Sequence, residues 1–120
     1  MSGGEGPGVT VNMRDQAGHT LPADEMADRA VEAASFLKAL SHEGRLMILC
    51  HLSAGEKSVN ALEDLLSARQ AAVSQHLARL RNEGLVTARR DGKVIFYSIK
   101  DPKVRAVIAL VYEMFCGAEA

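Results

Sequence analysis

The chain has 120 residues, a formal net charge of −1, and an apolar content of 48%. This length suits one domain, and no apolar run approaches the roughly 18 residues that a membrane-spanning helix needs. Residues 1–8 contain glycines and Glu5 where a signal peptide has cationic and apolar segments, so we expect a cytoplasmic protein without a membrane partner.

The N-terminal half is expected to hold a tail and three helices. Segment 1–20 is rich in glycine and has no apolar periodicity, which predicts a flexible tail before a single domain over 21–117. Apolar residues then recur at helical spacing from Pro22 to Leu40. Ser41 is a suitable N-cap for a second helix, and Ser58 for a short third helix over Val59–Leu66.

A fourth helix is predicted over about Gln70–Glu83, and its two faces differ sharply. Gln75 and Arg79 point away from the apolar side, and Gly84 is suited to end the helix in a left-handed conformation. Three apolar residues share the other face: Val73, Leu77 and Leu80.

The C-terminal part is predicted to form a β-hairpin followed by a last helix. Two β-prone segments, 85–90 and 93–99, are joined by Asp91-Gly92, a strong hairpin signal. Asp101-Pro102 supplies an N-cap and an N1 proline for the last helix. Its apolar stripe is broad enough to face more than one neighbour, which fits a dimer interface.

A helix, a tight turn, a polar-faced helix and a basic hairpin make up the winged helix-turn-helix plan, a mainly α fold with a β-hairpin wing. The interval from Arg69 to Lys93 holds six basic residues against two acidic ones, the footprint of a local DNA-binding surface. Gln75 suits adenine, and Arg79 suits guanine or phosphate in double-stranded operator DNA. Three hairpin cations are expected at phosphates or in the minor groove: Arg89, Arg90 and Lys93.

Several phrases of the sequence resemble the ArsR (ArsR/SmtB) family of bacterial transcriptional repressors, over about residues 30–115. They are Phe36-Leu-Lys-Ala-Leu-Ser-His42, Arg45-Leu-Met-Ile-Leu, Val73-Ser-Gln-His-Leu-Ala-Arg-Leu-Arg81 and Glu83-Gly-Leu-Val86. The resemblance implies a homodimer, joined through its first and last helices, that represses its operator until an inducer acts. It also implies DNA contacts from three residues: Gln70, Ser74 and Gln75.

The metal sites common in this family are incomplete in this sequence. Where the family's thiolate site lies, the chain has Ser58 and Asn60 in place of soft ligands. The second site, on the last helix, would here consist of Asp101, Lys103, Met114 and Gly117. One carboxylate cannot hold zinc in its usual four-coordinate geometry, so we expect no metal and no other cofactor.

The two cysteines support two interpretations. Their number alone is typical of buried, inert thiols in a reducing compartment. Their placement, with Cys50 late in the second helix and Cys116 at the end of the last, resembles the sulfide- and persulfide-responsive (SqrR/BigR) type within the family. That resemblance implies that the reduced dimer binds DNA. A di- or polysulfide bridge within each protomer, formed by a persulfide or polysulfide inducer, would then release it.

Three other functions are alternatives to a persulfide-responsive repressor. A metal or metalloid sensor would use Cys50, His51 and Cys116, although His51 points about 100° away from Cys50 on a helix and would need a ligand from the other protomer. An enzyme such as a thiol peroxidase is disfavoured because the sequence has no Cys-x-x-Cys pair and no nucleotide loop. A winged helix that binds only proteins is disfavoured by the polar face of the fourth helix.

Overall fold

A computed structural model describes residues 22–117, so the tail predicted over 1–20 lies outside the described residues. The chain divides into two compact parts between Ser35 and Phe36. Helix α1 (Ala23–Leu40) crosses this division, and up to Ser35 it is almost entirely exposed, with an ion pair of 3.0 Å between Arg29 and Glu32. No helix among residues 22–117 is long and apolar enough to cross a membrane.

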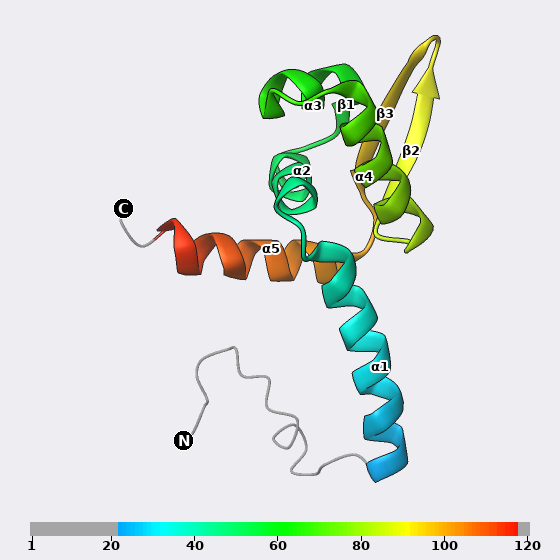
Figure 1. The fold of residues 1–120 in the computed structure, drawn as a ribbon, viewed down its shortest axis with the longest axis vertical. Helices are drawn as coiled ribbons and strands as arrows, with labels where there is room; N and C mark the ends of the chain where they lie inside the picture. Colours follow the sequence, from blue (N-terminus) through cyan, green and yellow to red (C-terminus); the bar gives the residue numbers. More distant parts are fainter. Residues whose placement is uncertain (1–21, 118–120) are drawn as a thin grey trace. The chain divides into compact units, whose positions relative to one another are not determined.

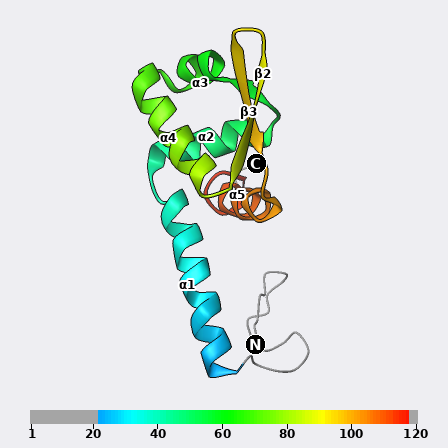
Figure 2. The same ribbon diagram turned by 90° about the vertical axis from the view of Figure 1, so that its right-hand side faces the viewer.

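The second part has the winged helix-turn-helix architecture that the sequence predicts. Figures 1 and 2 show α2 in the centre, with α3, α4 and the hairpin on one side of it and α5 on the other. Its elements are α2 (Glu43–Ser53), β1 (Lys57–Ser58), α3 (Val59–Leu66), α4 (Gln70–Asn82), β2 (Val86–Asp91), β3 (Val94–Ile99) and α5 (Pro102–Phe115).

The hydrophobic core surrounds α2. Ile48, Leu49 and Leu52 are completely buried in it, and α2 packs against α3, α4, β3 and α5. Burial of one such side chain stabilises the fold by about 1.5–3 kcal/mol. Neighbouring elements contribute Leu62, Val73, Leu77, Leu80, Val86, Val104 and Ile108. The buried face predicted for α4 is therefore confirmed.

Two of the three predicted helix caps are confirmed, and one is wrong. The Ser58 hydroxyl accepts a hydrogen bond from the Ala61 N–H, and the Asp101 carboxylate accepts one from the Lys103 N–H. The N-cap of α2 is His42 rather than Ser41. His42 has the extended backbone that an N-cap needs, and its ring Nδ1 accepts a hydrogen bond of 2.9 Å from the N–H of Gly44.

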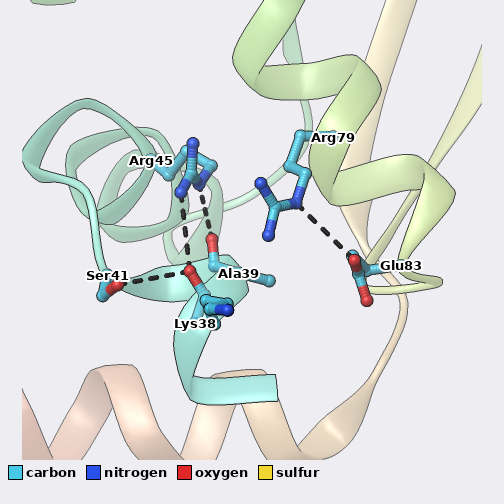
Figure 3. Close-up of polar contacts among 6 residues, drawn as sticks. All are labelled: Lys38, Ala39, Ser41, Arg45, Arg79 and Glu83. Atoms are coloured by element: carbon cyan, nitrogen blue, oxygen red, sulfur yellow. Dashed lines mark hydrogen bonds and ion pairs between the residues drawn. The ribbon is translucent and has the colours of Figure 1, made fainter. Parts of the chain in front are cut away.

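The corner between α1 and α2 is closed by Arg45. Its Nε donates to the carbonyl oxygen of Ala39 at 2.6 Å, and its Nη2 to that of Lys38 at 3.5 Å (Figure 3). The Ser41 hydroxyl donates to the same Lys38 carbonyl at 3.3 Å. The last carbonyl groups of a helix have no partner within it and favour a nearby cation, so Arg45 fixes where α1 ends and how α2 begins.

The hairpin is present, but its turn lies one residue later than predicted. Asp91 pairs with Val94, so the loop consists of Gly92 and Lys93 rather than Asp91-Gly92. Gly92 has a φ of +66°, and a two-residue loop with glycine first is favoured by hairpins of type II′. The tip thus presents Lys93 within the turn itself.

A third strand, β1, completes the sheet in the order β1-β3-β2 and was not expected from the sequence. It pairs antiparallel with β3, with Lys57 opposite Tyr97 and Ser58 opposite Phe96. Two residues are too few to show the alternation by which strands are recognised. This short pairing anchors the hairpin to the start of α3.

His42 also links the start of α2 to α4. Its ring lies against that of His76, with a distance of 4.4 Å between the centroids. A Cβ atom on Gly44 would lie only 2.7 Å from Nε2 of His76, so this contact requires glycine. Burial lowers the pKa of His76, and electrostatic repulsion by the neighbouring His42 and Arg45 side chains lowers it further. The fold therefore favours a neutral His76.

This shift predicts that the protein loses stability in acid. The pKa of His76 is lower in the folded than in the unfolded chain, so the unfolded state binds more protons below about pH 6.5. The free energy of unfolding, measured in urea at one protein concentration, should fall between pH 7 and pH 5. The fall should be smaller in His76→Gln, whereas His51→Gln should retain it. Equal pH dependence in all three proteins would contradict the assignment to His76.

Candidate nucleic-acid interface and thiol pair

The outer face of α4 brings together three of the predicted DNA-contact residues. Gln70, Ser74 and Gln75 are all exposed. By helical spacing Gln75 lies opposite the buried apolar residues, Ser74 lies on the flank, and Gln70 lies in the first turn. Arg69 stands at the N-cap and makes no side-chain hydrogen bond to the first turn. The first N–H groups of α4 therefore lack a side-chain cap, and the end of a helix in this state favours an anion.

Arg79, one turn after Gln75, is already paired within the protein. It is half-buried, and its Nε lies 3.6 Å from a carboxylate oxygen of Glu83. Figure 3 shows its guanidinium between Glu83 and the corner that Arg45 closes. The ion pair with Glu83 thus competes with DNA for this guanidinium, and a contact of Arg79 with a base stays a prediction.

On the wing, Arg89 is already engaged within the protein. Its Nε and Nη2 donate to the two carboxylate oxygens of Glu56 at 2.8 Å and 2.9 Å, and its guanidinium carbon lies 4.7 Å from the ring centroid of Phe96. The hydrogen bonds from Arg89 lower the pKa of Glu56, so this carboxylate stays ionised. Arg90 and Lys93 are exposed and form no ion pair within the described residues.

Both cysteines are free and exposed, so the interpretation of buried thiols is wrong. The buried stripe of α2 consists of Ile48, Leu49 and Leu52, and Cys50 points away from it. Cys116 is the C-cap residue of α5, where the helix ends. Each thiol is therefore accessible to a reagent.

The two thiols influence one another. Partial burial raises the pKa of Cys50, and the negative charge of Cys116 raises it further. Such an effect needs two charges near each other, which agrees with the packing of α2 against α5. At neutral pH Cys50 is therefore mostly a neutral thiol beside a second cysteine.

Beside Cys50, α2 and α5 form an open hollow of about 530 Å³. Its wall includes Ser53 and Ala54 from the end of α2 and Arg105, Ile108 and Tyr112 from α5. No pattern in the sequence connects Arg105 with Cys50, because the two residues are 55 positions apart and only tertiary packing brings them to one wall.

The donor set proposed for a metal sensor is not assembled. No three side chains of His, Cys, Asp or Glu among residues 22–117 come close enough together to hold a metal ion. His51 is half-buried and does not line the hollow beside Cys50. Within residues 22–117 of one protomer, the two thiols therefore have no third metal-binding side chain beside them.

Comparisons with known proteins agree with this architecture. The family model described as bacterial regulatory protein, arsR family, matches residues 42–88. The Biofilm growth-associated repressor of Agrobacterium fabrum is 43% identical over 99 residues, which cover 82% of this chain and 85% of that protein. The Transcriptional activator HlyU of Vibrio cholerae is 40% identical over 101 residues, covering 84% and 94%.

Solved structures show the same likeness. The transcriptional repressor BigR from Xylella fastidiosa superposes with a TM-score of 0.73 at 41% identity, covering 80% of this chain and 98% of that one. Reduced HlyU from Vibrio cholerae gives a TM-score of 0.74 at 41% identity, covering 77% and 97%. These similarities extend well beyond α4 to most of the described chain.

The interaction between the thiols predicts the pH profile of Cys50. Its rate of alkylation, followed by peptide mass spectrometry, should rise with pH, and the midpoint of that rise should give a pKa above the ordinary value of about 8.5. In Cys116→Ser this pKa should fall, because the neighbouring negative charge is gone, yet stay above the ordinary value because burial remains. An identical profile in both proteins would mean that the two thiols do not interact.

Proposed function

The chain belongs to the ArsR family and is a DNA-binding transcriptional regulator; from this premise we propose that it is a homodimeric repressor that persulfides or polysulfides release from its operator. The observation that carries the proposal is the accessible pair Cys50 and Cys116 on two helices that pack together. No enzymatic activity is needed, since the signal modifies the regulator itself.

In this proposal α4 is the helix that enters the major groove. Gln70, Ser74 and Gln75 present exposed polar groups to base edges, and a phosphate binds the uncapped N–H groups of the first turn. Arg90 and Lys93 on the wing meet the DNA backbone. Arg79 contributes a positive charge near the backbone after it leaves Glu83, and Arg89 does so after it leaves Glu56.

A homodimer accounts for the apolar surface of α5. Its second half exposes several large apolar side chains, which a monomer in water rarely leaves uncovered as a group. The most exposed of them are Leu110, Tyr112, Met114 and Phe115. Two protomers joined there would present two copies of α4, as a two-fold symmetric operator requires.

The thiol chemistry needs only a sulfane sulfur as oxidant. A Cys50 thiolate attacks the outer sulfur of a persulfide R–S–SH, an S–S bond forms, and RS⁻ leaves and takes up a proton. The Cys116 thiolate then attacks the Cys50 sulfur atom, expels HS⁻ and completes a disulfide. If Cys116 also carries an added sulfur, the same attack by its terminal sulfur gives a trisulfide.

Such a bridge would act on DNA binding through geometry. It would tie α2, which packs against α4, to the end of α5, where the proposed dimer interface lies. Operator half-sites are about 34–36 Å apart, so a small rotation of one α4 relative to the other prevents both from binding at once. One similar solved structure, HlyU from Vibrio cholerae, is described as the reduced form of that protein.

The proposal predicts that single cysteine variants bind DNA but do not respond. Reduced wild type, Cys50→Ser and Cys116→Ser should bind an operator fragment equally, measured by fluorescence anisotropy at one salt concentration. After an organic persulfide, the wild-type affinity should fall about 10- to 100-fold, a usual size for allosteric coupling. Both variants should keep their affinity, because neither can form the bridge.

Ser53→Ala is the matched control, since it changes the wall of the hollow without removing a thiol and should respond like wild type. Intact-protein mass spectrometry identifies the signal when reduced protein is treated separately with organic persulfide, peroxide and zinc. Loss of two hydrogens, without added sulfur for a disulfide or with it for a polysulfide bridge, and absent under peroxide, supports the proposal. Unchanged mass with persulfide, together with bound zinc, favours a metal sensor instead.

On the wing, the carboxylate of Glu56 competes with DNA phosphate for Arg89. Glu56→Gln should bind operator DNA more tightly than wild type, because it frees Arg89 for phosphate. The dependence of log affinity on log salt should steepen by about one for each protomer. Glu32→Gln, which removes an acid from the exposed ion pair with Arg29, controls for net charge and should change neither quantity as much. Equal effects of both variants would show that Glu56 acts only through overall charge.

A further inference from the structure

The hollow beside Cys50 has the size and the lining of a small-molecule site. Its volume of about 530 Å³ lies within the roughly 300–1,000 Å³ range of ligand pockets and far exceeds the roughly 30 Å³ share of one water. Ile108 and the ring of Tyr112 make much of its wall apolar. A nucleophilic sulfur atom stands at one side of this space.

One cation faces this hollow. Arg105 lines it, and the only hydrogen bond that its guanidinium makes among residues 22–117 is a long one of 3.4 Å to the carbonyl oxygen of Ser53. It has no carboxylate partner within these residues. A guanidinium has five N–H donors in a planar fork that matches a carboxylate, so most of its binding capacity is unused.

We propose that this hollow binds a small organic persulfide that carries a carboxylate, with Arg105 holding the carboxylate while the sulfane sulfur reaches Cys50. The inference rests on the proposed function and names the substrate class of the same site. Arg105 is then a specificity-determining residue, and the apolar wall covers the carbon chain between the two ends of the ligand.

The state of Cys50 explains why such an anchor is useful. Burial leaves little of this thiol ionised at neutral pH, and a weakly ionised thiol reacts slowly with a reagent at low concentration. Holding the reagent beside the sulfur converts a collision between two molecules into a reaction within one complex. An inorganic polysulfide would leave most of the 530 Å³ empty and has no planar carboxylate for Arg105.

The first test compares two reagents. The rate of sulfur transfer to Cys50 is followed by mass spectrometry with a carboxylated persulfide, cysteine persulfide, and with its methyl ester. Arg105→Gln should slow the reaction of the carboxylated reagent about tenfold, equivalent to about 1.4 kcal/mol, and leave the ester unaffected. Arg105→Lys should restore part of the rate through its charge but not the bidentate geometry.

Lys103→Gln is the matched control, because it removes another exposed cation from the same helix and Lys103 does not line the hollow. It should react like wild type with both reagents. If Arg105→Gln and Lys103→Gln slow the carboxylated reagent equally, Arg105 acts only through overall charge, and the inference is overturned.

A second test separates this inference from the proposed function. Iodoacetate carries a carboxylate and iodoacetamide does not, so the ratio of their alkylation rates reports an anion site without any persulfide. Arg105→Gln should lower this ratio at Cys50 but not at Cys116. An unchanged ratio overturns the anion site even if persulfides react. A lowered ratio in a protein that no persulfide modifies overturns the assigned ligand and the proposed function, while the anion site stands.

Discussion

The buried face of α2 is the constraint on which the rest of the structure depends. Ile48, Leu49 and Leu52 fill the centre of the core, and α3, α4, β3 and α5 all pack against this one helix. Protein interiors are close-packed, so a helix surrounded in this way cannot move without displacing its neighbours. Whatever holds or turns α2 therefore acts on both the nucleic-acid side and the α5 side.

The two ends of α2 meet different partners. Near its start, Gly44 and the His42 cap contact His76 of α4, and six residues later Cys50 faces the hollow shared with α5. Six residues span roughly 9 Å of a helix axis, a distance over which a helix behaves as a rigid rod. A bond formed at Cys50 is thus mechanically connected to α4, the helix proposed to enter the major groove, without any unfolding or long pathway between them.

Features that depend on local chemistry were predictable from the sequence, and features that depend on distant contacts were not. The caps Ser58 and Asp101 and the buried face of α4 follow from residues within one or two turns. The turn was displaced to Gly92-Lys93 because the pairing register of the strands, and not the Asp-Gly dipeptide, decides where a hairpin reverses. The candidate site divides in the same way: residue type and order identified Cys50, Cys116 and the outer face of α4. The partners that tune them come from elsewhere in the chain, as Glu56 and Arg105 do.

Those partners explain how a chain with a net charge of −1 can present a DNA-binding surface. Glu56 and Glu83 each neutralise one arginine of the basic interval, and both ion pairs are largely exposed, so they contribute little to stability and exchange readily. A phosphate displaces such a carboxylate only if it approaches from the direction in which the guanidinium already points. The fork of Arg89 points at the Glu56 carboxylate and lies over Phe96. If Arg89 turns to DNA as proposed, a backbone that places a phosphate at the position of that carboxylate gains a bidentate contact. On this proposal a polyanion of another shape breaks the pair without that gain, so the Glu56 carboxylate would make the wing selective for the geometry of DNA as well as for its charge.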